Sequence, residues 1–310
     1  MAEDLPDTDV TLRFSRVAIE MFTHVIFTDE RALEATLRGP TMITTTAPDG
    51  SSVRAYDEGQ GPVILLLHGG MDEGASWARV AARLRSRFRV LRLHRRQYRL
   101  DLKSREVCTM AEEVEHVRAL VKLIHEPMLI VGHSSGGVLA LEALAALPEA
   151  FAGAVLYEPP CVIGPPLGGE ALTRAQAAMA AGNPGRALAI FLRDIVRTPA
   201  WVAWMSGASV SLMPRLGRLA PHQLDDCAAI DEVGLRLDAY ARIDVPVVLL
   251  GGERSPAHLG ERLGALEHAM PNTERVRLRR QGHAANNLAP ARVAEVIAGL
   301  GDKVLRNPSQ

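Results

Sequence analysis

The sequence predicts an α/β protein with a mostly parallel, doubly wound sheet of about eight strands and a helical insertion. Three observations predict this class: short apolar runs with the length of buried strands, helical periodicity between those runs, and one long stretch without strand signals. The chain has 310 residues, of which 47% are hydrophobic and 23% are charged. These values are typical of one large globular domain that carries an insertion.

Residues 41–160 carry most of the strand and helix alternation. They begin with two β-rich pieces joined by Pro-Asp-Gly at 48–50, a turn sequence that predicts a hairpin. Apolar runs such as 63–67 then alternate with helical patterns such as 76–85, and the same rhythm resumes over 243–310. We therefore predict that 41–160 and 243–310 together form a sheet core with helices on both faces.

Residues 161–242 contain several helical stretches and no convincing strand. Because they lie between two predicted strands, we expect a helical lid, or cap, over one edge of the sheet. Its apolar residues, such as Phe191 and Trp204, either pack the lid onto the core or line an apolar pocket, and both alternatives stay open. Residues 1–40 are predicted to be a mostly helical extension that packs on this chain or on a partner.

Charge and composition exclude several classes of protein. A net charge of −1 and a pI near 6.8 give no field that attracts nucleic acid or an anionic membrane. We interpret the local cluster of Arg92, Arg95, Arg96 and Arg99 as a solvated surface. Three scattered cysteines argue against a disulfide framework or a zinc site. The acidic N-terminus and the short apolar runs lead us to expect a cytoplasmic protein without a membrane span.

The segment 132–136 has the pattern G-x-S-x-G and stands between an apolar run and an Ala/Leu-rich helix pattern. Such a strand–turn–helix holds its central serine in a strained conformation, and the glycines let the backbones approach closely. Ser134 would then lie near a helix N-terminus, whose dipole favours developing negative charge. We predict Ser134 as the nucleophile, with a plain helix N-cap as the alternative.

Two glycines follow the strand pattern at 63–67 and leave backbone N–H groups bare. We predict the N–H groups of Gly70 and Ser135 as the oxyanion donors, with Met71 as the alternative to Gly70. An ordinary turn at the end of a strand is the other explanation. His283 follows the last strand pattern, at the sheet edge where a base can reach the serine, so it is the predicted base. His133 is the alternative base, but we expect the turn to point its side chain away from Ser134.

These stretches, in this order, resemble the α/β-hydrolase superfamily and specifically its lid-bearing, esterase-like branch, over roughly residues 41–300. The resemblance implies that HGG supplies the oxyanion site, GHSSG the nucleophile and QGH the base. The family commonly has an aspartate after the strand before the last one, and that aspartate orients the histidine. Here the corresponding residue is Ser255, which cannot stabilise an imidazolium as a carboxylate does.

Another carboxylate is therefore expected to complete the triad. Glu158 follows the next strand after the nucleophile, where some lipases of this fold carry their acid, and two prolines follow it. We predict Glu158 as the acid and Glu253 as the second candidate. A role for Glu158 that only fixes the hinge of the lid stays open.

Together, these residues predict a serine hydrolase that cleaves a carboxylic ester or lactone of a mainly apolar small molecule through an acyl-enzyme. The prediction requires no metal and no organic cofactor, and it expects no nucleic acid or membrane partner; a homodimer stays open. One alternative is the same fold with other chemistry, such as a C–C bond hydrolase, a perhydrolase or a biosynthetic tailoring enzyme. The other is a non-catalytic binder of small molecules.

Overall fold

The structure, a computed structural model, describes residues 40–101, 107–210 and 213–305. Its centre is an eight-stranded sheet with the order β1-β2-β4-β3-β5-β6-β7-β8. The hairpin strands β1 and β2 pair antiparallel, β2 also pairs antiparallel with β4, and the other pairs are parallel. The predicted fold class is confirmed, whereas the predicted helical extension at 1–40 lies almost wholly outside the described residues. The strands are β1 (Thr41–Thr46), β2 (Ser52–Glu58), β3 (Val63–Leu67), β4 (Arg89–His94), β5 (Met128–His133), β6 (Phe151–Tyr157), β7 (Val247–Gly252) and β8 (Thr273–Leu278).

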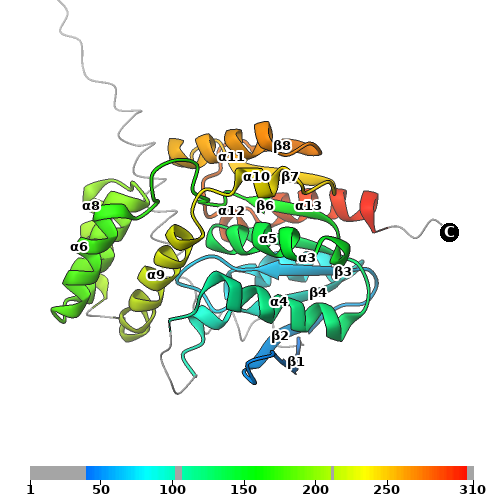
Figure 1. The fold of residues 1–310 in the computed structure, drawn as a ribbon, viewed down its shortest axis with the longest axis horizontal. Coiled ribbons are helices and arrows are strands. Elements are labelled where there is room, and N and C mark those ends of the chain that lie inside the picture. The colour runs from blue at the N-terminus through cyan, green and yellow to red at the C-terminus, as the bar shows by residue number, and fades with distance from the viewer. Residues whose placement is uncertain (1–39, 102–106, 211–212, 306–310) are drawn as a thin grey trace, which may run out of the picture.

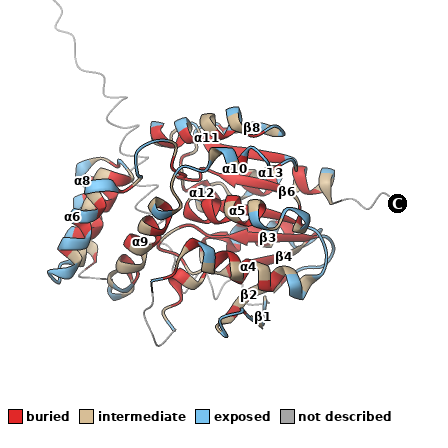
Figure 2. Ribbon diagram, in the orientation of Figure 1, coloured by how far each residue is buried: buried red, intermediate tan, exposed pale blue. Residues whose placement is uncertain are grey.

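Helices cover both faces of the sheet (Figure 1). Successive side chains of a strand point to opposite faces, so Leu65 and Leu67 pack in one apolar layer, whereas Ile64 and Leu66 pack in the other. The inner strands β3, β5, β6 and β7 are almost continuously buried, as expected of a parallel sheet between helices (Figure 2). The first layer includes α4 (Met110–Ile124), α5 (Ser135–Ala146) and α11 (Ala257–Ala269), and the second includes α3 (Ala78–Leu84) and α13 (Pro290–Val304).

We use "cap" for residues 161–242, which connect β6 to β7; the cap helices between residues 169 and 233 lie beside the sheet in Figure 1. The cap has its own apolar cluster, which also includes Met71 and Tyr98 from the loops after β3 and β4. A bridge between Val162 and Leu235 joins the two ends of the cap. The separation into cap and core stays a prediction. The cap elements are α6 (Gly169–Ala180), α7 (Pro184–Ile190), the π-helical turn η4 (Phe191–Ile195), α8 (Ala200–Ser209), α9 (Pro214–Val233) and α10 (Leu237–Tyr240).

The arginine cluster is not a solvated surface, so that prediction is wrong. Arg92, Arg95 and Arg99 are 1%, 0% and 3% exposed. Each guanidinium is paired with a carboxylate: Arg92 donates to Glu58 at 3.0 Å, and Arg99 donates to Asp101. For Arg92 the reason is topological, because β4 is an inner strand and the carboxylate that pairs with Arg92 comes from β2, far away in the sequence.

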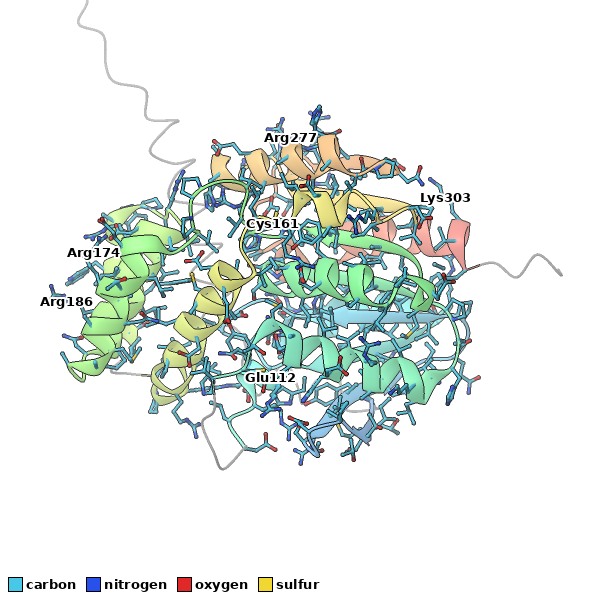
Figure 3. The ribbon with its side chains drawn as sticks, viewed as in Figure 1. Glu112, Cys161, Arg174, Arg186, Arg277 and Lys303 are labelled. Carbon is cyan, nitrogen blue, oxygen red and sulfur yellow. The ribbon has the colours of Figure 1, made fainter. Side chains whose placement is uncertain are left out.

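The outer helices of the cap expose apolar side chains that the sequence predicted to pack or to line a pocket. Trp204 on α8 is 71% exposed, and Trp201 beside it is also exposed. Trp204 lines a surface hollow together with Arg174 and Arg186, which Figure 3 shows at the outer side of the cap. Among the described residues, no helix is both long enough and apolar enough to cross a bilayer.

Helix α4 begins with a reciprocal pair of hydrogen bonds. The side chain of Thr109 accepts from the Glu112 N–H at 3.2 Å, and the Glu112 carboxylate accepts from the Thr109 N–H at 2.7 Å. Thr109→Ala should therefore lower the free energy of unfolding by about 1 kcal/mol, measured by urea unfolding. Thr109→Ser keeps the acceptor and should unfold like the unaltered protein. Equal midpoints for Thr109→Ala and the unaltered protein would contradict this expectation.

Candidate active site

Ser134 occupies a strained turn between β5 and α5, with φ 52° and ψ −128°. The flanking glycines make this turn possible, because a Cβ on Gly132 would lie 2.3 Å from the Gly136 carbonyl oxygen. A Cβ on Gly136 would lie 2.3 Å from the His68 carbonyl oxygen. Strand, helix and the loop after β3 are thus in direct backbone contact. Ser134 lies at the N-terminus of α5 and lines a pocket at the carboxyl ends of the parallel strands.

His283 lies in the loop between β8 and the short helix α12 (Ala285–Leu288) and lines the same pocket as Ser134. Its Nδ1 lies 2.6 Å from a carboxylate oxygen of Glu158. Because an ionised carboxylate only accepts hydrogen bonds, Nδ1 carries the proton of the neutral ring and Nε2 keeps its lone pair. This is the tautomer that can accept a proton from a hydroxyl group.

The structure brings Glu158, and not Glu253, to the His283 ring. Glu158 follows β6 with φ 47°, its side chain is 1% exposed, and its second oxygen accepts from the Gly252 N–H at 2.7 Å. Both carboxylate oxygens are therefore held in place. The Glu253 carboxylate is exposed and accepts instead from the Arg280 N–H at 2.7 Å, a contact that lowers the pKa of Glu253.

Two side chains that the sequence did not predict for this role hold the loop of His283. The His133 Nε2 donates to the His283 carbonyl oxygen at 2.8 Å. The Tyr157 hydroxyl donates to the Gly282 carbonyl oxygen and accepts from the Ala285 N–H at 3.0 Å. The ring of His133, the competing base, thus contacts the backbone of the loop that carries His283. The only sequence signal for this pair is that both residues end strands whose carboxyl ends meet at the site.

The candidate oxyanion residues Gly70, Met71 and Ser135 all line the pocket that contains Ser134. The loop that bears Gly70 and Met71 is braced by His68, whose Nδ1 lies 2.8 Å from the Gly69 carbonyl oxygen. The His68 Nε2 accepts from the Arg95 N–H at 3.1 Å, which leaves Nδ1 as the donor. Burial lowers the pKa of His68, so its ring is neutral. The loop is therefore fixed by a side chain that does not face the pocket.

The remaining wall of the pocket is mainly apolar and comes largely from the cap. His258 on α11 also lines it, and its Nε2 lies 3.1 Å from the Val196 carbonyl oxygen. Burial lowers the pKa of His258 to about 4, so this ring is also neutral near pH 7. The apolar wall consists of Pro160, Leu167, Phe191, Leu192, Ile195, Val196, Ile230 and Leu259. In the described part of the chain, no cluster of His, Cys, Asp or Glu side chains could hold a metal ion.

A family model described as "Alpha/beta hydrolase family" matches residues 64–296, which is more than half of the chain. Among solved structures, an alpha/beta hydrolase from Sphaerobacter thermophilus is similar, with a TM-score of 0.72 and 27% identity over 83% of this chain and 99% of that one. A thermophilic esterase from Thermogutta terrifontis has a TM-score of 0.67 and 19% identity, and the match covers 86% of this chain and 100% of that one. At this identity, the second likeness concerns the fold alone.

Curated relatives match a shorter part of the chain. Protein phosphatase methylesterase 1 from Rattus norvegicus is 38% identical over 101 residues, which cover 30% of this chain and 26% of that protein. The protein of the same name from Homo sapiens is 38% identical over 96 residues, or 28% and 25% of the two chains. The match therefore spans about a quarter of the length of these relatives.

The Tyr157 hydroxyl links both ends of the short segment that carries His283. Tyr157→Phe should remove both of its hydrogen bonds and lower the free energy of unfolding by about 1–3 kcal/mol, because the buried Gly282 carbonyl and Ala285 N–H lose their partner. Urea unfolding measures this change. Tyr56→Phe removes a hydroxyl outside the site and is the matched control. A smaller loss for Tyr157→Phe than for Tyr56→Phe would contradict the role of Tyr157.

Proposed function

Because the chain belongs to the alpha/beta hydrolase family, we propose that it cleaves a carboxylic ester or lactone of a mainly apolar small molecule. The observation that carries this proposal is the hydrogen bond between the His283 Nδ1 and the Glu158 carboxylate. His283 lines the same pocket as Ser134. Three strand ends far apart in sequence supply a hydroxyl, an imidazole and a buried carboxylate. This is the combination that nucleophilic acyl transfer requires.

In the proposed reaction, the Ser134 hydroxyl attacks the carbonyl carbon while the His283 Nε2 takes the hydroxyl proton. The buried Glu158 carboxylate stabilises the imidazolium that forms. The backbone N–H groups of Ser135 and Gly70, or of Met71 in place of Gly70, donate to the oxyanion. The imidazolium protonates the leaving alkoxide. Water then attacks the acyl-enzyme while His283 takes a proton from it, and the imidazolium returns this proton to the Ser134 oxygen as the bond to the acyl carbon breaks and the carboxylic acid leaves.

The lining of the pocket supports an apolar acyl or ring group in the substrate. Its cap wall is mainly aliphatic and aromatic, with Gln223 as a neutral polar member, and His258, which lines the pocket from α11, is neutral near pH 7. A charged group placed there would lose its hydration without gaining an opposite charge, which is costly. The curated relatives are methylesterases by name, which also supports an ester bond as the target.

A fluorophosphonate probe tests the nucleophile directly, because it forms a covalent adduct with an activated serine. We expect labelling of the unaltered protein at Ser134 and complete loss of labelling in Ser134→Ala. Ser206→Ala removes a buried serine hydroxyl on α8 that does not line the pocket, and this variant should be labelled at an unchanged rate. Labelling that persists in Ser134→Ala would overturn the proposal. A panel of p-nitrophenyl esters, lactones and β-diketones then separates ester cleavage from C–C bond cleavage on the same fold.

The acid is tested by an isosteric change. Glu158→Gln keeps the shape of the side chain but cannot stabilise the imidazolium, so kcat for a p-nitrophenyl ester should fall by roughly 10²- to 10⁴-fold with KM nearly unchanged. Glu253→Gln is the matched control and should retain kcat, because Glu253 faces the Arg280 N–H. Equal kcat values for Glu158→Gln and the unaltered enzyme would exclude Glu158 as the acid.

A further inference from the structure

We propose that Arg95 is a positioning residue that holds the two halves of the oxyanion site together and links them to cap helix α9. The inference rests on the proposed function and deepens it. Arg95 follows β4 and is fully buried, and it does not line the pocket. It therefore acts through its neighbours and not on a substrate.

The Arg95 guanidinium contacts both halves of the oxyanion site. One nitrogen, Nη1, donates to the Ser135 hydroxyl at 2.8 Å and to the His68 carbonyl oxygen at 3.2 Å. Ser135 carries one proposed oxyanion donor, and His68 begins the loop that carries Gly70. The Arg95 backbone N–H also donates to the His68 ring. A single residue thus connects the loop after β3 to the first turn of α5.

The contact with Ser135 matters because of the place of Ser135 in its helix. Ser135 is the first residue of α5, so its backbone N–H has no acceptor within the helix. That N–H is available to an oxyanion, but no helical hydrogen bond fixes its direction. The side-chain bond to Arg95 supplies this restraint, since it anchors the same residue from its other side.

Two buried carboxylates fix the guanidinium itself. The Arg95 Nε donates to Glu113 on α4 at 2.9 Å, and its Nη2 donates to Asp226 on cap helix α9 at 2.8 Å. Glu113 and Asp226 are 3% and 1% exposed. Although burial disfavours the charged form, Asp226 and Glu113 keep the pKa of Arg95 well above its ordinary value. The cation is permanent, and one of its two anchors belongs to the cap.

Helix α9 also contacts the second half of the proposed oxyanion site, the loop that carries Gly70. The Tyr98 hydroxyl donates to Asp226 at 2.6 Å and also lies 3.3 Å from the side-chain amide of Gln223. Gln223 lines the pocket and lies against Gly70, where a Cβ would be 1.8 Å from the Gln223 amide oxygen. The position of α9 is therefore coupled to Gly70 through Gln223 and to Ser135 through Arg95.

Arg95→Lys tests this role, because lysine keeps the positive charge but lacks the planar guanidinium. A single ammonium group cannot donate to all four partners, which are Ser135, His68, Glu113 and Asp226. We expect kcat for a p-nitrophenyl ester and the rate of Ser134 labelling by a fluorophosphonate to fall by roughly 10- to 100-fold, with KM changed less than about 3-fold. The matched control is Arg92→Lys, which alters another buried, carboxylate-paired arginine of the same region that does not touch Ser135. It should lower the melting temperature to a similar extent and retain kcat.

A double-mutant cycle separates positioning from general stability. Ser135→Ala removes the hydroxyl that Arg95 holds but keeps the backbone N–H, so it should lower kcat in the same direction. If Arg95 acts through this bond, Arg95→Lys should have a much smaller effect on kcat in the Ser135→Ala background. Multiplicative losses, an unchanged kcat in Arg95→Lys, or an equal loss in Arg92→Lys would overturn the inference.

The outcomes also separate this inference from the proposed function. If the unaltered protein is not labelled at Ser134, the proposed function fails, and the inference that rests on it fails too. If the unaltered protein is labelled and Arg95→Lys is labelled equally fast, only the inference is overturned. If Arg95→Lys does not fold, Ser135→Ala decides: a lower kcat with unchanged KM supports the inference, and an unchanged kcat overturns it.

Discussion

The site depends on the close approach of three backbone segments: β5, the first turn of α5, and the loop after β3. Glycines 132 and 136 have no room for a side chain, because carbonyl oxygens lie where a Cβ would be. This contact accompanies the positive φ of Ser134 and brings the loop that carries Gly70 beside the N-terminus of α5. The strain at Ser134 is sustained because the core on both sides of the sheet is fully buried around it.

Much of this arrangement could be predicted because its signals are local. The G-x-S-x-G pattern contains both the turn and its glycines, and His283 is identified by its place after the last strand. Glu158 could be proposed from the order of strand ends, since neighbouring parallel strands end at one edge of the sheet. That edge rule could not choose between Glu158 and Glu253, because only coordinates show which carboxylate faces the ring and which faces the Arg280 N–H.

The predictions that were wrong, or never made, concern long-range partners. Four arginines close together in the sequence predict a solvated surface. Arg95 is instead buried between α4 and α9, where it pairs with Glu113 and Asp226 from distant parts of the chain. Likewise, no local pattern shows that His133 and Tyr157 turn toward the loop of His283. The apolar surface of Trp204 predicts packing onto the core or a place in the pocket near Ser134, yet Trp204 is 71% exposed and lines only a hollow at the outer side of the cap. Composition and periodicity describe single elements, and these contacts join elements.

The place of Glu158 has a consequence for anyone who recombines this chain with a relative. The carboxylate that contacts His283 is followed at once by Pro159, Pro160 and the first residues of the cap. Foreign helices spliced in directly after β6 would therefore replace or displace Glu158, even if the sheet itself were left intact. A chimaera boundary therefore belongs beyond Pro160. The transplanted segment then changes the pocket wall, while the Glu158 carboxylate and its contact with the Gly252 N–H stay unchanged.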